Sequence, residues 1–143
     1  FPRSIFRESS RAYAFDPIAL ELTREGLACG HFSMLEHPWE RTMFAMPLVH
    51  AEGPNLRARA AVNVQLAKET LSMAPDELKP AYEFCLAQSR RHKVIIDRFG
   101  RHPHRNKTLR RPSAPGEQVY ITNGEFPHQH AINPRKPKPF RST

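Results

Sequence analysis

Cysteine is scarce in this sequence of 143 residues, which contains Cys29 and Cys85 as its two cysteines. Neither belongs to a C-x-x-C motif, so the sequence predicts no disulfide framework and no cysteine-based zinc site. Long apolar stretches are missing as well, since no run approaches the roughly 20 residues that span a bilayer, and no signal-peptide core is visible. We therefore predict a chain without a membrane span, whose cysteines are small buried side chains in a reducing, intracellular compartment.

Familiar catalytic motifs are absent too. The sequence has no G-x-S-x-G motif, no P-loop and no H-E-x-x-H motif. Two H-x-H pairs, at 102–104 and 128–130, could chelate zinc from a strand, but no nearby carboxylate or cysteine completes a set of four ligands. We therefore predict no catalytic residues, no cofactor and no metal site.

Acidic residues are few in one part of the chain. Residues 90–111 contain nine Lys and Arg against Asp97 alone, which makes this segment +8, the formal net charge of the whole chain. Residues 16–89, in contrast, contain six Lys and Arg against ten Asp and Glu. A concentrated basic segment favours negatively charged partners, such as nucleic acid, an anionic membrane surface or an acidic protein.

Helix signals are abundant, whereas strand signals are almost missing. Proline and glycine punctuate the first hundred residues at the positions where helices typically begin and end. Between them, apolar residues recur with helical spacing over residues 16–29, 38–46, 54–71 and 76–99. Four helices joined by proline-marked turns predict an all-α fold, an antiparallel array of helical hairpins.

Beyond residue 111 the sequence changes character. Six prolines fall within twenty-eight residues, from Pro112 to Pro139. We predict no helix of any length there, but an extended Pro-rich basic tail with at most one short ordered stretch around residues 119–121. The predicted organisation is a helical domain over residues 1–111 followed by a tail over residues 112–143.

Three segments carry a resemblance to a known family. They are F-P-R-S-I-F-R at the start, R-A-Y-A-F-D-P-I-A-L over the first helix and R-H-K-V-I-I-D-R-F-G-R-H-P-H-R-N at the end of the fourth. They resemble domain of unknown function 924, a mainly bacterial family, over residues 1 to about 113. The resemblance implies a tetratricopeptide-like fold, in which paired antiparallel helices stack side by side.

The chain also departs from the family pattern. The family has helices before the segment at which this chain starts, so we expect an N-terminally truncated copy with an exposed apolar face that other protein subunits cover. Where the family usually has P-F-E-H-S-E, residues 47–52 are P-L-V-H-A-E, and the loss of a carboxylate at Val49 argues against enzymatic activity. The predicted partner contacts are Phe1, Ile5, Phe6 and Phe15.

The basic stretch R-F-G-R-H-P-H-R-N, at residues 98–106, is a candidate anion-binding turn. Guanidinium groups bind phosphate or carboxylate with two parallel hydrogen bonds, and histidines add donors. Alternatively, the arginines pair with Glu52, Asp97 or a helix C-terminus and stabilise the last turn of the helix. The candidate anion-binding residues are Arg98, Arg101, His102, His104 and Arg105.

The favoured function is a non-catalytic helical adaptor, a structural subunit of a larger assembly. An RNA-containing assembly such as an organellar ribosome fits the charge, because basic tails neutralise rRNA phosphates without reading sequence. On this interpretation the protein is intracellular, in the mitochondrial matrix or another organelle. The candidate RNA or phosphate contacts are Arg110, Arg111, Arg135, Lys136, Lys138 and Arg141.

Two alternatives remain open at the level of sequence. In a protein-only assembly, for example a respiratory membrane complex, the tail residues would contact acidic side chains or lipid phosphates. In an enzyme or small-anion-binding protein, the basic turn would converge with Arg3 and His50 in one pocket.

Overall fold

The structure is a computed structural model that describes residues 5, 6, 8–124, 126 and 127. These residues form helices and connecting turns, without a strand among them, so the predicted all-α fold is confirmed. The elements in chain order are η1 (Ser10–Tyr13), α2 (Asp16–Ala28), α3 (His31–Met34), α4 (Pro38–Ala45), α5 (Pro47–His50), α6 (Leu56–Met73), η2 (Asp76–Leu78), α7 (Lys79–Phe99), η3 (Pro103–Arg105) and α8 (Pro115–Asn123).

The helices begin and end close to the predicted prolines and glycines. Pro38 is the first residue of α4, where its missing N–H is not needed, and the preceding backbone N–H of His37 is bound by the Glu40 carboxylate at 3.2 Å. Gly100 follows α7 with φ of +70°, and its N–H donates to the Ile96 carbonyl at 2.7 Å. Glycine adopts this left-handed conformation without steric cost, so α7 ends there.

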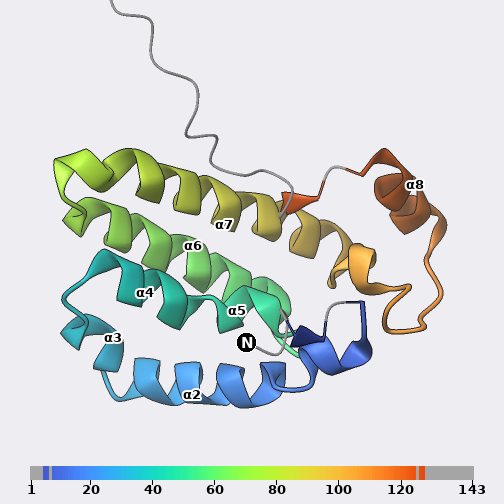
Figure 1. Ribbon diagram of the computed structural model, residues 1–143, viewed down its shortest axis with the longest axis horizontal. Helices are drawn as coiled ribbons and strands as arrows, with labels where there is room; N and C mark the ends of the chain where they lie inside the picture. Colours follow the sequence, from blue (N-terminus) through green and yellow to red (C-terminus); the bar gives the residue numbers. More distant parts are fainter. Residues whose placement is uncertain (1–4, 7, 125, 128–143) are drawn as a thin grey trace, which may run out of the picture.

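The helices stack side by side in one array (Figure 1). α2 lies against α5, α4 and α5 lie against α6, and α6 forms an antiparallel hairpin with α7. Two apolar clusters hold the array together between these helices, one of which contains Phe32 and Leu66 and the other Leu56 and Ile96. None of the helices in the described part of the chain is long and apolar enough to cross a bilayer.

The structure differs from the sequence prediction after α7. Residues 115–123, predicted to be extended, form α8, which starts with Pro115 in its first turn, where proline is compatible with a helix. The Ala114 N–H donates to the Glu117 carboxylate at 2.8 Å, which caps this helix. Tyr120 is buried against Phe99, with ring centroids 5.4 Å apart, so α8 packs on the end of α7.

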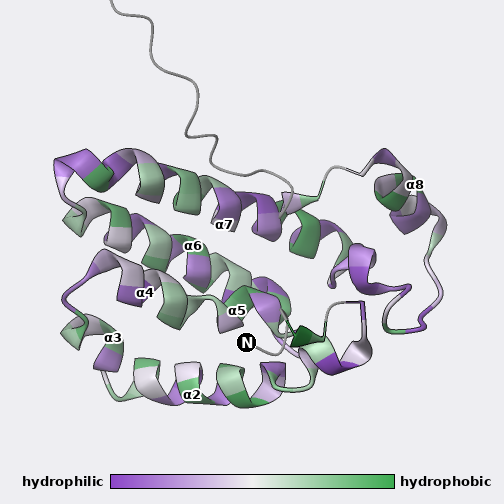
Figure 2. Ribbon diagram, viewed as in Figure 1, coloured by the Kyte–Doolittle hydropathy of each residue, from purple (hydrophilic) through white to green (hydrophobic). Residues whose placement is uncertain are grey.

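Exposure also differs from prediction at the cysteines. Cys29, which follows the last residue of α2, is exposed rather than buried. Cys85 is half-buried within α7. The segment between α7 and α8, which contains most of the basic stretch, is mainly hydrophilic (Figure 2).

Candidate functional site

The C-terminal end of α5 is held by two residues of the basic turn. His102 Nε2 donates to the Val49 carbonyl at 2.7 Å, and Arg105 Nη1 donates to the His50 carbonyl at 2.7 Å. The last carbonyls of a helix have no partner within that helix, so these bonds satisfy them. His102 is 1% exposed, and burial followed by the charge of Arg105 lowers its pKa to about 3, so the ring is neutral.

Arg101 forms a paired ion bridge with Glu117 of α8. Arg101 Nε and Nη2 each lie 2.6 Å from one of the two carboxylate oxygens. Asn106 Nδ2 donates to the same carboxylate at 3.2 Å. Glu117 is 4% exposed, and its hydrogen bonds to Arg101 lower its pKa to about 2 against the opposing effect of burial. This pair therefore attaches α8 to the turn.

A second ion bridge joins the turn to the segment after α5. Arg111 binds both carboxylate oxygens of Glu52, and one of these oxygens also accepts the His102 backbone N–H at 2.7 Å. Arg111 Nε donates to Asn106 Oδ1 at 3.0 Å. Burial alone would raise the pKa of Glu52, but the bonds from Arg111 and His102 outweigh it and lower that pKa.

The structure thus brings the predicted anion-binding residues into one turn and gives them protein partners. Arg101 and Arg105 bind carboxylate and carbonyl groups, whereas Arg98 is exposed and lies 4.8 Å from the Phe99 ring centroid. The centroid of the His104 ring lies 5.5 Å from the centroid of the His102 ring. These contacts stabilise the turn, as the alternative interpretation expects, and anion binding by these residues stays a prediction.

The other predicted contacts are divided between exposed and undescribed positions. Ile5 and Phe15 are 70% and 56% exposed, and Phe6 lies under the Arg11 guanidinium at 4.2 Å. Arg110 is exposed. Outside the described residues lie Phe1, Arg3, Arg135, Lys136, Lys138 and Arg141.

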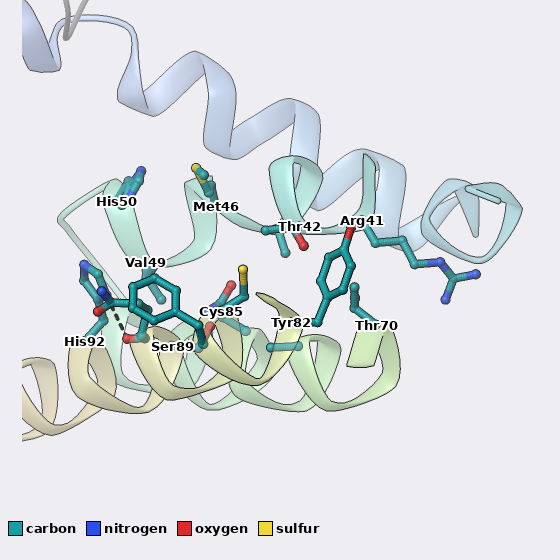
Figure 3. A pocket seen from close by; sticks show the side chains of 15 residues that line it. Arg41, Thr42, Met46, Val49, His50, Thr70, Tyr82, Cys85, Ser89 and His92 are labelled. Atoms are coloured by element: carbon teal, nitrogen blue, oxygen red, sulfur yellow. Dashed lines mark hydrogen bonds between the residues drawn. The ribbon is translucent and has the colours of Figure 1, made fainter. Parts of the chain in front are cut away.

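A cavity of about 230 Å³ lies between α4, α5, α6 and α7 (Figure 3). His50 and His92 lie at one end of it, and Thr70 and Tyr82 lie at the other. The ring centroids of the two histidines are 6.0 Å apart. Much of the wall between the two ends is apolar, and it includes Ala45, Met46, Val49, Ala67, Phe84 and Cys85.

One buried polar side chain lines this cavity without a hydrogen bond. Asn63 is 5% exposed and makes no side-chain hydrogen bond within the described part of the chain, but its polar atoms are accessible from the cavity and not fully enclosed. α6 and α7 are antiparallel, and Thr70 lies beside Tyr82 (Figure 3). Asn63 precedes Thr70 by about two turns and Ser89 follows Tyr82 by about two turns, so both lie toward the histidine end.

Several other polar groups around the cavity form hydrogen bonds with backbone carbonyls. His92 Nδ1 donates to the Gln88 carbonyl at 2.9 Å, which makes Nε2 the acceptor of the neutral ring. Thr42 and Thr70 donate to carbonyls of their own helices at 3.0 and 2.8 Å. Arg41 points away from the cavity, and its Nε donates to the Leu35 carbonyl at 2.9 Å.

The described residues that line the cavity include Arg41 but no carboxylate. Two histidines line it as well. The Arg59 side chain, which does not line the cavity, is 9% exposed and donates to the Leu48 and Ala51 carbonyls, without an ion pair to a carboxylate in the described part of the chain. Burial, followed by the charge of Arg24, lowers the pKa of Arg59.

The cavity is poorly suited to nucleophilic or metal chemistry. Burial raises the pKa of the Cys85 thiol, and burial followed by Cys85 raises the pKa of the Tyr82 phenol, so both groups keep their protons at neutral pH. Across the described residues no three His, Cys, Asp or Glu side chains are grouped to hold a metal ion. The arrangement instead suits binding of an apolar body with one polar group.

The sequence predicts His50 in one pocket with the basic turn, whereas the cavity contains His50 and none of the five candidate residues of that turn. Nothing in the sequence singles out Asn63. A signal for the cavity was nevertheless available, because Asn63, Ala67 and Thr70 recur at i, i+4 and i+7 on α6. Small and polar residues at helical spacing, opposite a similar stripe at residues 82–92, indicate a face that is buried but incompletely filled.

Comparison with known proteins gives one solved relative. The chain is similar to a protein of unknown function, ATU0120, from Agrobacterium tumefaciens, with 31% sequence identity and a TM-score of 0.61. The alignment covers 87% of this chain and 62% of that chain, so this chain spans less than two thirds of the relative's length. No curated protein matches the sequence.

Residues 1–125 match a family described as bacterial protein of unknown function (DUF924), and this match includes α8. The expected location in the mitochondrial matrix or another organelle is wrong, because the family is bacterial and the solved relative comes from Agrobacterium. The resemblance seen in the sequence is confirmed, and the chain belongs to the DUF924 family of bacterial proteins.

Proposed function

We propose that this protein binds a small, mainly apolar molecule with one hydrogen-bonding group in the cavity between α4, α5, α6 and α7. The observation that carries the proposal is Asn63, a buried amide that lines the cavity and lacks a protein partner. The polar atoms of this amide are accessible from the cavity, so a molecule that enters the cavity can form a hydrogen bond with them. A ligand that hydrogen-bonds to the amide explains its presence.

The size of the cavity limits the ligand. An apolar cavity of about 150 Å³ holds benzene, which has six non-hydrogen atoms. At the same packing, 230 Å³ corresponds to about nine non-hydrogen atoms. The proposed ligand therefore resembles a short acyl chain or a single substituted aromatic ring.

The test compares two substitutions on the same helix. Ala67 lines the cavity, whereas Ala58 is exposed on α6, so Ala67→Phe fills the cavity and Ala58→Phe is the matched control. A series of straight-chain acids, amides and alcohols with four to ten carbons is titrated into the 143-residue chain and followed by heteronuclear NMR. We expect saturable shifts in α6 and α7 for the unmodified chain and Ala58→Phe, and their loss in Ala67→Phe. Binding that survives Ala67→Phe, or no binding by any member of the series, would overturn the proposal.

The helical adaptor is a second proposal, supported by an exposed apolar stripe on α2. Phe15, Ile18 and Leu22 recur at i, i+3 and i+7 and are 56%, 58% and 64% exposed. Such a stripe suits contact with another protein.

Co-purification through a C-terminal tag, with and without nuclease, tests whether the partner is protein or RNA. A defined set of co-purifying proteins that is lost in Ile18→Asp and in Leu22→Asp supports a protein-bound adaptor. If the same proteins co-purify with both variants, the apolar stripe is not the contact surface.

A further inference from the structure

We propose that the ligand carries a second hydrogen-bonding group, a hydroxyl, which binds Tyr82 at the end of the cavity away from Asn63. This inference rests on the proposed binding function, which requires a hydrogen-bonding group at Asn63 alone. It adds the chemical class of the ligand: a short aliphatic chain with an alcohol at one end and a polar group at the other. The geometry that points to it is a second buried polar group without a hydrogen bond in the same cavity, the phenol of Tyr82.

Tyr82 resembles Asn63 in its burial and its lack of a hydrogen-bond partner. It is 9% exposed and makes no side-chain hydrogen bond within the described part of the chain, and its hydroxyl is not fully enclosed. The ring extends from α7 toward Thr42 of α4 (Figure 3). Burial, followed by Cys85, raises the pKa of the phenol, so the hydroxyl keeps its proton. It is therefore a donor for a molecule in the cavity.

Two acceptors accompany this donor at the same end of the cavity. Thr42 and Thr70 line the cavity near Tyr82, and each donates its one hydroxyl proton to a carbonyl of its own helix, at 3.0 and 2.8 Å. A hydroxyl oxygen with a committed proton still has lone pairs to accept with. A ligand hydroxyl matches this set, because it accepts from Tyr82 and donates to a threonine.

The second group is uncharged because this end of the cavity offers no counter-ion. Arg41 points away from the cavity, and its guanidinium donates to the Leu35 and Ser33 carbonyls at 2.9 and 3.2 Å. No Asp or Glu is among the described residues of the lining. A buried ammonium or carboxylate without a partner is costly, whereas a hydroxyl needs hydrogen bonds alone.

The separation of the two polar ends sets the length of the chain. Asn63 and Thr70 are seven residues apart on α6, or about 10 Å along the helix axis, and Tyr82 lies beside Thr70. The wall between the two ends is mainly apolar and includes Met46 and Ala67. Hexane-1,6-diol has a hydroxyl at each end of an apolar chain, and its eight non-hydrogen atoms fit the about nine that the cavity holds.

The experiment compares hexane-1,6-diol with hexan-1-ol by NMR titration of the 143-residue chain. In an apolar site the extra hydroxyl would weaken binding, because it would lose its hydration without a new partner. We expect the opposite, about fivefold tighter binding of the diol, from the added hydrogen bonds. Butane-1,4-diol is too short to reach both ends and should gain less than about twofold over butan-1-ol.

Tyr82→Phe removes the hydroxyl and keeps the ring. It should cancel the advantage of hexane-1,6-diol and change the affinity for hexan-1-ol by less than about twofold. Its Tm should not fall, because the hydroxyl has no protein partner within the described chain. The matched control is Tyr13→Phe in η1, outside the cavity, which should leave both affinities unchanged.

The outcomes separate this inference from the proposed function. Hexane-1,6-diol binding no tighter than hexan-1-ol would overturn the second hydroxyl and leave a site with one polar contact. Equal weakening of both probes by Tyr82→Phe would show a packing role for this residue, and an equal gain at four and six carbons would show that one end binds both hydroxyls. Either result also overturns the inference. Failure of every probe, together with the four- to ten-carbon series, would overturn the binding function itself.

Discussion

The turn after α7 and the cavity beside it are both rich in polar groups, but they use them differently. In the turn, Arg101 and Arg111 each bind a carboxylate with two donors, and His102 caps a helix. In the cavity, Asn63 is 5% exposed and makes no side-chain hydrogen bond within the described chain. The dense motif of the sequence therefore forms bonds within the protein, whereas an inconspicuous asparagine lines the cavity that we propose as a ligand site.

The comparison predicts a large loss of stability when a partner is removed from the turn. Arg101→Ala leaves the Glu117 carboxylate, which is 4% exposed, without its main partner. Breaking such a buried pair costs about 3 kcal/mol, and urea unfolding should show this decrease. Lys93→Ala, which breaks the half-exposed pair with Asp97, is the control and should cost less than about 1 kcal/mol. Similar losses in both variants would contradict a structural role specific to Arg101.

A second way to test the turn is its response to acid. His102 has a pKa of about 3 in the folded protein, against about 6.5 when unfolded, so the unfolded state binds more protons between these values. Stability is therefore complete above about pH 6.5 and falls as the pH is lowered toward 3, by up to about 1.4 kcal/mol per pH unit.

The matched variant for this prediction is His102→Phe. It should cost about 1–2 kcal/mol at pH 7.5, because the Val49 carbonyl loses its donor, and it should flatten the decline between pH 6.5 and 4.5. Urea midpoints at several pH values measure both effects. An unchanged slope in His102→Phe would assign the acid sensitivity to other groups, and the exposed His31→Asn serves as the reference.

In the cavity, we expect a substitution to raise the stability of the protein and not to lower it. Asn63→Leu replaces a buried amide without a partner by an apolar side chain of similar size, so stability should rise by about 1 kcal/mol, or a few degrees in Tm. The same change should abolish binding of the straight-chain acids, amides and alcohols proposed as probes. Gln65→Leu, at an exposed position of α6, should alter neither quantity. A loss of stability in Asn63→Leu would show that the amide has a structural role.

The smallest effect is expected at the exposed edge of the turn. Arg98 lies over the Phe99 ring and is open to solvent, and exposed cation–π contacts contribute about 0.5 kcal/mol. Arg98→Ala should therefore lower the unfolding free energy by about that amount. If Arg98→Ala matched Arg101→Ala in thermal scans, the division between an exposed edge and a buried centre of the turn would be incorrect.

Much of the fold was predictable, and little of the site was. Pro38 and Gly100 act through their own backbone restrictions, so α4 and α7 could be placed from sequence. The proline content of residues 112–143 as a whole argues against a helix, yet α8 forms because Pro115 occupies a first-turn position and no proline follows before Pro127. Asn63 was missed because a polar residue on a helix is usually exposed, and its burial depends on α4 and α7.

The sequence by itself determined the helix positions, the concentration of positive charge in residues 90–111 and membership of the DUF924 family. Only the tertiary structure decided which arginines meet carboxylates and which polar groups face a cavity. The physical reason is separation along the chain. Arg101 and Glu117 are 16 residues apart, and Arg111 and Glu52 are 59 apart, so their pairing follows from how the helices pack and not from local backbone preference.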